Sequence, residues 1–507
     1  MMKSFQAALV PEAQEGGGDD ERLLLDCLRR DAAAFDIGLS DGDLALALGV
    51  ARALFSEPTR SSRDLAEDFQ VTRDDLLRIY RILRNMPKVQ DAWTFDSPLR
   101  RRVSFLRREL LPENAATLTS LFRGEVCLPN QVEFHPALVC NLRCRACPNC
   151  QPDSNGQWHF IGYPELGRPL NDERLRLIED LFLDLGVESF SFGGGGEPSL
   201  SDLTLGGITH LRKRSASAEI SLYTNGIFPD GWGDEEAGIL AAGLNKVRFS
   251  IDAANAEEWS RYKGRRPELF ETLWENIARV VAAKRRLGSG IRIGASCLVS
   301  NFAANVEDFL TRARDTGLDF CDIKEIETCY GEKAEYKAVG LAGNESFATL
   351  LAKVRARHFA PLDVVVDDNL LRRDDAPGGE TLAPTRCWVA IRGRMLTVGP
   401  YGELHPCSDA ANPGSQYRRA HKDTIGQLTD FANLQELKND FLDIWRESLA
   451  RRTALSRSGC AYCVPSHNNF NLAVEKLYQD WGYGILPEEQ PFAGVQDHYQ
   501  ASRGLRR

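Results

Sequence analysis

The chain has 507 residues, of which 43% are hydrophobic and 26% are charged, and its formal net charge is −10. This composition excludes wholesale disorder, and the length predicts two or three domains. The negative charge argues against nucleic acid as the main partner, because phosphate binding needs a basic surface. With no long apolar run and no apolar leader in the sequence, we expect a cytoplasmic protein without a membrane partner.

The N-terminal quarter predicts a tail followed by helices. Residues 1–20 contain the triplet Gly16–Gly18 and are expected to form a flexible tail. Residues 21–125 carry helical apolar periodicity, with N-cap candidates at Ser61 and Thr72. We interpret them as a helical N-terminal domain that packs on its neighbour or on a second subunit of a homodimer. A DNA-binding helix-turn-helix is the alternative.

Between about residues 126 and 340, short apolar segments alternate with amphipathic helices. Repeated β-α units predict parallel strands with right-handed crossovers. The fold class is therefore α/β, with a partial (β/α)6 TIM-like barrel over 126–340. In such a barrel the loops after the carboxyl ends of the strands carry the chemistry. The predicted strands are 131–138, 187–192, 218–223, 246–251, 291–299 and 319–326.

Residues 341–507 predict a C-terminal domain that is rich in cysteine. Its glycine- and proline-containing turn at 399–402 is typical of a hairpin. The features expected there are a strand over 362–366, a hairpin from Cys387 to Cys407, a helix over 427–448 and the pair Cys460 and Cys463.

Three cysteines follow the first predicted strand at the spacing CxxxCxxC, namely Cys140, Cys144 and Cys147. Thiolates on one loop can converge on zinc or on an iron–sulfur cluster. Three ligands to a four-iron cluster leave one iron open for chemistry, whereas a structural site is closed by four. Cys150 forms a further CxxC with Cys147, so a closed structural zinc site is the alternative.

This cysteine motif resembles the signature of the radical SAM superfamily. The resemblance implies a [4Fe–4S] cluster whose open iron binds S-adenosylmethionine, and a 5′-deoxyadenosyl radical formed when the cluster donates an electron. It also implies an electron donor such as flavodoxin or ferredoxin. Ala146 departs from the family, which usually has an aromatic residue before the third cysteine.

Motifs at the later strand ends are similar to the cofactor-binding positions of the same family. The run from Gly193 to Pro198 resembles its GGE motif, which meets the methionine end of the cofactor. For Asn225, Ser250 and Asp252, capping of the next helix is the alternative role. The cofactor-binding residues implied by the resemblance are Gly195, Gly196, Glu197, Thr224, Asn225, Ser250, Asp252 and Val299.

The C-terminal cysteines resemble the SPASM or shorter twitch extension of radical SAM enzymes, which holds an auxiliary iron–sulfur cluster. Four ligands imply one fully ligated second [4Fe–4S] cluster, serving as an electron relay or a structural anchor. A zinc knob is the alternative, because the sequence does not distinguish zinc from iron at four thiolates. The implied metal ligands are Cys387, Cys407, Cys460 and Cys463.

The N-terminal helices resemble those of sugar- and aminoglycoside-modifying members, which include a paromamine diol dehydratase and a dideoxysugar deaminase. This implies hydrogen abstraction from a carbinol carbon of a sugar or aminoglycoside, followed by 1,2-diol dehydration in antibiotic biosynthesis, which is a lyase reaction. Glu325 and Glu327 share one face of a regular strand and are the candidate catalytic acids. Salt bridges are their alternative role, and Asp367 and Asp368 are secondary candidates.

Other outcomes stay open at this point. An auxiliary cluster that accepts a second electron favours an oxidoreductase, and the same site is compatible with epimerisation of an aminosugar or aminocyclitol. A peptide-modifying maturase and a zinc-stabilised regulatory protein are the further alternatives.

Overall fold

The structure is a computed structural model of the chain. It divides into two units, one of residues 1–127 with 469–507 and one of residues 128–468. The first unit includes the whole range 21–125 of the predicted helical domain, which lies largely outside the described residues and stays a prediction. The structure describes residues 42, 46–47, 49–50, 68–71, 121, 124–145, 147, 149–299, 305–325, 349–350, 352–354, 356–366, 387–412, 424–429, 431–454, 471 and 474.

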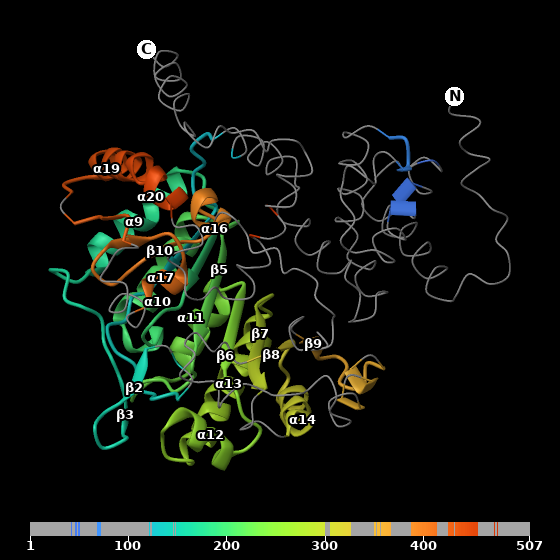
Figure 1. The fold of residues 1–507 in the computed structure, drawn as a ribbon. Helices are drawn as coiled ribbons and strands as arrows, with labels where there is room; N and C mark the ends of the chain where they lie inside the picture. Colours follow the sequence, from blue (N-terminus) through green and yellow to red (C-terminus); the bar gives the residue numbers. More distant parts are fainter. Residues whose placement is uncertain are drawn as a thin grey trace. The chain divides into compact units, whose positions relative to one another are not determined.

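The second unit is a mixed α/β fold built on a large sheet (Figure 1). Its strand order is β12-β11-β10-β1-β4-β5-β6-β7-β8-β9, and every neighbouring pair from β10 to β9 is parallel. The bounds are β1 Gln131–Phe134, β4 Ser189–Phe192, β5 Glu219–Thr224, β6 Lys246–Ser250, β7 Arg292–Val299, β8 Phe320–Glu325, β9 Asp363–Val366, β10 Leu396–Val398, β11 Glu403–His405 and β12 Gly426–Gln427. A separate hairpin pairs β2 (Cys150–Pro152) with β3 (Trp158–Phe160).

Helices pack beside this sheet (Figure 1), where α10 contacts α9 and α11, and α13 contacts α11, α12 and α14. Phe134, Phe190 and Phe192 are buried on one face of the sheet, where Phe192 lies against Gly207 of α10. The helices are α9 Asp172–Asp184, α10 Asp202–Arg214, α11 Asp234–Gly243, α12 Ala256–Lys263, α13 Leu269–Leu287, α14 Val306–Thr316, α16 Trp388–Arg392, α17 Ser408–Ala411, α19 Leu434–Glu447 and α20 Leu449–Ala454. None of the helices among the described residues is long and apolar enough to cross a bilayer.

The sheet differs from the predicted barrel in its extent. The strand predicted over 362–366 is present as β9, and it pairs with β8 in the same sheet. The predicted hairpin is present as β10 and β11, and β10 pairs in parallel with β1. The sheet therefore crosses the boundary expected at residue 340, and β9 and β12 form its two edges. The separate domain over 341–507 remains a prediction.

On the face of β1 opposite to Phe134, buried side chains form a hydrogen-bond network. Tyr163 accepts a hydrogen bond from the Gly195 N–H (2.9 Å), and its hydroxyl lies 3.2 Å from His135 Nδ1. His135 Nε2 lies 2.8 Å from Glu133 Oε1. With the phenol donating to Nδ1, the proton of His135 sits on Nε2 and points to Glu133. These hydrogen bonds connect β1 and the residue after it to the loop after β4.

The buried carboxyl of Glu403 on β11 predicts a pH-dependent stability. Burial raises the pKa of Glu403 from 4.5 to about 7. Between these values the folded protein keeps a proton that the unfolded chain releases, so the free energy of unfolding falls as the pH rises. We expect wild type to lose roughly 3 kcal/mol relative to Glu403→Gln between about pH 4 and about pH 8. Urea unfolding of both proteins at the two pH values measures this, and a constant difference would contradict it.

Candidate cofactor site

The cysteine loop begins directly after β1 and carries the three predicted cluster ligands. The Cys147 N–H donates to the Cys144 carbonyl (3.1 Å), and the Cys150 N–H donates to the Cys147 carbonyl (3.2 Å). Backbone N–H groups also reach two of the sulfurs: Leu142 donates to Cys140 Sγ (3.5 Å), and Asn149 donates to Cys147 Sγ (3.4 Å). Such donors stabilise negative charge on a thiolate.

The thiols of this loop lie close enough to influence one another. Burial, and then the neighbouring Cys144, raise the pKa of Cys140. Burial raises the pKa of Cys144 to about 12, although Lys263 acts in the opposite direction. The pKa of Cys150 is raised first by a hydrogen bond to Cys147 and then by burial. Thiols that stay protonated in this environment lose their protons when iron binds.

The donor chemistry of the loop fits an iron–sulfur cluster, because three thiols on one segment are the ligand type such clusters use. In the part of the chain that the structure describes, no three His, Cys, Asp or Glu side chains are grouped around a position for a single metal ion.

The glycine loop between β4 and Glu197 lies directly on the cysteine loop. The Glu197 N–H donates to the Val139 carbonyl (2.9 Å). A Cβ at Gly196 would come within 2.6 Å of the Val139 oxygen and 2.7 Å of the Ala137 oxygen. Gly194 has φ +134, which favours glycine, and a Cβ there would lie 2.9 Å from His135. Glycine at these positions allows the backbone of the two loops to make contact.

Glu197 ties the glycine loop to the end of β5. Its carboxylate is buried and accepts hydrogen bonds from Ser199 N (2.9 Å), Thr224 Oγ1 (2.6 Å) and Asn225 N (2.7 Å). Burial raises the pKa of Glu197, whereas these hydrogen bonds lower it. Donors of the chain itself therefore reach both carboxylate oxygens of this predicted cofactor-binding residue.

Asn225, directly after β5, is hydrogen-bonded to the beginning of the cysteine loop. Its Nδ2 donates to Asn141 Oδ1 (2.8 Å) and lies 3.9 Å from Cys140 Sγ. Asn141 in turn donates from Nδ2 to the Ile227 carbonyl (2.6 Å). The sequence did not single out Asn141, although its place directly after the first ligand is a signal that could have done so.

Asp252, at the end of β6, is part of a buried ion pair that the sequence did not predict. Its Oδ2 lies 2.6 Å from Lys263 Nζ, and its Oδ1 accepts from Ser296 Oγ (3.2 Å). The side chains of Lys263 and Asp252 are 3% and 4% exposed, so the pair is shielded from solvent. Asp252 adopts φ +66, which is uncommon for a residue other than glycine.

The structure describes the remaining predicted site residues only in part. Ser250 is half-buried at the end of β6, and the backbones of Val299 and Glu325 pair between β7 and β8. Cys387 precedes α16 and Cys407 precedes α17, at the two ends of the segment that contains the β10–β11 hairpin. The residues that lie outside the described part are Glu327, Asp367, Asp368, Cys460 and Cys463, together with the side chains of Val299 and Glu325.

Three polar side chains lie together on strands β5, β6 and β8. Arg248 Nη1 donates to Asp322 Oδ2 (3.3 Å), and the guanidinium carbon lies 4.5 Å from the centre of the Tyr223 ring. The Arg248 Nε is buried and has no hydrogen-bond partner. The paired strands place these residues in the same phase as Ser250.

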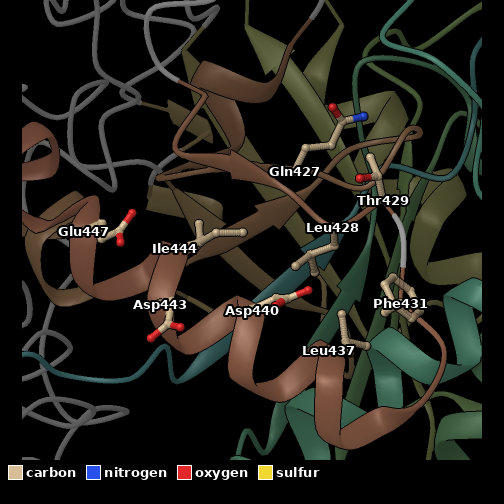
Figure 2. Close-up of a pocket in the computed structure, with 9 residues that line it drawn as sticks. All are labelled: Gln427, Leu428, Thr429, Phe431, Leu437, Asp440, Asp443, Ile444 and Glu447. Atoms are coloured by element: carbon tan, nitrogen blue, oxygen red, sulfur yellow. The ribbon is translucent and has the colours of Figure 1, made fainter.

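A small pocket of about 230 Å³ lies between β12 and α19, where Asp440 and Leu437 project from the helix (Figure 2). None of the predicted cofactor-binding residues lines it, so we assign it no part in the site. Its lining residues are Gln427, Leu428, Thr429, Phe431, Leu437, Asp440, Asp443, Ile444 and Glu447.

Residues 135–293 match the model of the family described as the Radical SAM superfamily. This segment is therefore similar to radical SAM domains, a family that implies a [4Fe–4S] cluster and S-adenosylmethionine. The resemblance seen in the cysteine motif is confirmed at that level, and the matched range includes the cysteine loop, the glycine loop and Asp252.

The curated relatives of this chain include proteins named GTP 3′,8-cyclase. The protein from Streptomyces coelicolor is 28% identical over 238 residues, which cover 45% of this chain and 62% of the relative. The protein from Gloeobacter violaceus is 26% identical over 222 residues, which cover 43% and 61%. The chain thus spans about three fifths of the length of these relatives. Among solved structures, Streptococcus suis SuiB bound to the precursor peptide SuiA has a TM-score of 0.46 and 14% identity, covering 75% of this chain and 76% of that one.

The contact between the two loops predicts that Gly196→Ala impairs cluster loading. The new methyl group would meet two backbone carbonyls, which cannot move aside as a flexible side chain can. We expect the iron content after anaerobic reconstitution to fall by up to about half, because only the cluster of the cysteine loop is affected. Gly290→Ala is the matched control, because no atom lies within 4 Å of a Cβ there. Equal iron content in both variants would show that the close approach is not required.

Proposed function

We propose that this protein is a radical SAM enzyme whose cysteine loop holds the catalytic [4Fe–4S] cluster through Cys140, Cys144 and Cys147. The observation that carries the proposal is the direct packing of that loop against the glycine loop, with Glu197 and Asn225 holding the two together. When bound, the cluster supplies the electron that cleaves S-adenosylmethionine to a 5′-deoxyadenosyl radical. A reduced flavodoxin or ferredoxin is the proposed electron donor.

The residues of the chain position and shield this chemistry. Glu197 fixes the glycine loop, whose backbone approaches the methionine end of the cofactor. Gly195, Gly196 and Thr224 belong to the same hydrogen-bonded region, because Tyr163 and Glu197 accept bonds from Gly195 and Thr224. Ser250 and Asp252, at and just after the end of β6, are the proposed residues at the position that contacts the ribose or the methionyl carboxylate. The backbone near Val299, at the end of β7, is the proposed contact for the adenine.

We infer a polyhydroxylated small-molecule substrate, a sugar or an aminoglycoside, and a 1,2-diol dehydration. Hydrogen abstraction from a carbinol carbon makes its hydroxyl more acidic. A carboxylate, Glu325 or Glu327, takes that proton and returns it to the hydroxyl of the neighbouring carbon, which leaves as water. The α-keto radical that remains takes up one electron from the proposed reductant and one proton, which gives a ketone lighter by one water. Dehydrogenation and epimerisation start from the same abstraction and remain the alternative outcomes.

A second [4Fe–4S] cluster on Cys387, Cys407, Cys460 and Cys463 completes the proposal. The hairpin that separates the first two of these cysteines brings distant parts of the chain to β1, through the pairing of β10. This arrangement supports a role in electron relay or as an anchor of the C-terminal segment.

A nucleotide substrate is the second candidate. Relatives of the chain are named GTP 3′,8-cyclase, which is a cyclisation rather than a dehydration. The observation that favours an anionic substrate is Arg248, a cation whose Nε is buried without a hydrogen-bond partner beside Tyr223. A phosphate or carboxylate oxygen is the natural acceptor for such a group.

The ligand assignment predicts the effect of replacing Cys140, Cys144 and Cys147 together by alanine. Wild type should bind about eight irons per chain and the variant about four, because only the auxiliary cluster remains. The variant should form no 5′-deoxyadenosine from S-adenosylmethionine and dithionite, whereas wild type should form it and convert a diol-bearing aminosugar to a product lighter by one water. Iron analysis, chromatography and mass spectrometry measure these results. Unchanged 5′-deoxyadenosine formation in the variant would refute the assignment.

The two substrate classes differ in their dependence on Arg248. For a nucleoside triphosphate, Arg248→Met should raise KM about 10- to 100-fold, because a hydrogen bond to a charged group is worth about 1.5–3 kcal/mol. For an uncharged or cationic sugar, KM should change little. Initial rates of wild type, Arg248→Met and Arg248→Lys with both substrates distinguish the classes. Turnover of the aminosugar alone would exclude the nucleotide candidate.

A further inference from the structure

The turn at the end of α12 holds both sides of the central cysteine. The Arg143 N–H donates to the Lys263 carbonyl (2.9 Å), and the Arg145 N–H donates to the Tyr262 carbonyl (3.0 Å). Gly264 ends the helix with φ +64, and a Cβ there would lie 2.8 Å from the Arg143 oxygen. Cys144 lies between these two backbone hydrogen bonds, so residues 262–264 form a bracket for it.

The side chain of Lys263 turns inward from this bracket. Its ammonium lies 2.6 Å from Asp252 Oδ2 and 4.9 Å from the centre of the Tyr262 ring. Asp252 is fixed in turn by Ser296, through side-chain and backbone hydrogen bonds of 3.2 and 3.0 Å. A buried ion pair gains little net stability, because both charges lose their hydration. Stability alone therefore does not account for this buried ion pair, so its effect on neighbouring groups has to be considered.

The pair acts on the Cys144 thiol, because the two neighbours of Cys144 in the chain are hydrogen-bonded to residues 262 and 263. Burial lowers the pKa of Lys263, but Asp252 and then Cys144 raise it by more, so the side chain stays cationic. Reciprocally, Lys263 is the largest influence that lowers the pKa of Cys144. Asp252 carries one negative charge, which balances the positive charge of Lys263. Three thiolates and a cluster that accepts an electron would add further negative charge at the same place.

We propose that Lys263 is a positioning residue that orients the cysteine loop and whose buried positive charge raises the reduction potential of the cluster bound there. This inference rests on the proposed function, because it needs a cluster on Cys140, Cys144 and Cys147. A positive charge in a low-dielectric interior stabilises the more negative, reduced state of its neighbour. The step concerned is the transfer of one electron from an external reductant to the cluster.

The test compares Lys263→Met, which removes the charge, with Lys263→Arg, which retains it. At a fixed solution potential, Lys263→Met should show an about tenfold lower ratio of reduced to oxidised cluster, equivalent to about 59 mV for one electron. Lys263→Arg should stay close to wild type. Arg261→Met is the matched control, because it removes an exposed cation from the same helix. Redox titrations followed by electron paramagnetic resonance measure the ratio, and circular dichroism checks the folding of each metal-free chain.

The outcomes separate this inference from the proposed function. A wild-type chain that binds no iron–sulfur cluster overturns the proposed function. A loaded wild type with an unchanged potential in Lys263→Met overturns the inference alone. If Lys263→Met folds but fails to hold the cluster, full loading of Lys263→Arg supports the role of the charge, and failure of both variants overturns it.

Discussion

The buried carboxylate of Glu197 is the interaction on which the candidate site depends. Its three donors come from two segments, the residue after Pro198 and the end of β5. A carboxylate that lost these donors would be a buried charge without partners, which costs several kcal/mol. The same residue is attached through its backbone to Val139 of the cysteine loop. One residue thus joins the segments that follow β1, β4 and β5, through its backbone and its side chain together.

A second buried carboxylate has a comparable role on the other side of the cysteine loop. Asp252 holds Lys263, and the backbone of Lys263 holds Arg143. The loop is therefore attached to β5 through Asn225 and to α12 through the turn at 262–264. Attachment from two sides restrains the thiols before any metal binds, which reduces the conformational entropy that cluster assembly has to overcome.

The repeating part of the fold could be predicted from the sequence because each β-α unit carries its own periodic pattern. The strands β4 to β8 lie within or at the edge of the predicted segments, whereas the first strand ends at Phe134, just before Pro136, which has no N–H to donate. The pairing of β10 with β1 could not be predicted, because nothing local in either segment specifies a partner more than 250 residues away. The helix expected over 427–448 begins at Leu434, since Gly426 and Gln427 pair with β11.

Some residues of the candidate site could likewise be predicted from the sequence, and others could not. Residues on short motifs, such as Cys140, Glu197 and Asn225, could be found because their spacing and their place after a strand mark them. Tyr163 and Lys263 could not, because each acts through a contact between segments that are distant in sequence.

Asn149 shows how far such contacts extend. Its backbone N–H reaches Cys147 Sγ, while its side chain donates to the Gly195 carbonyl and to Asn412 Oδ1, both at 3.2 Å. Asn412 follows α17, the short helix that begins directly after Cys407. A single buried amide therefore links the first cysteine loop, the glycine loop and the segment of a predicted auxiliary ligand. Because an amide that loses one of these partners leaves a polar group unsatisfied in the interior, a displacement of either cysteine segment costs free energy at the other.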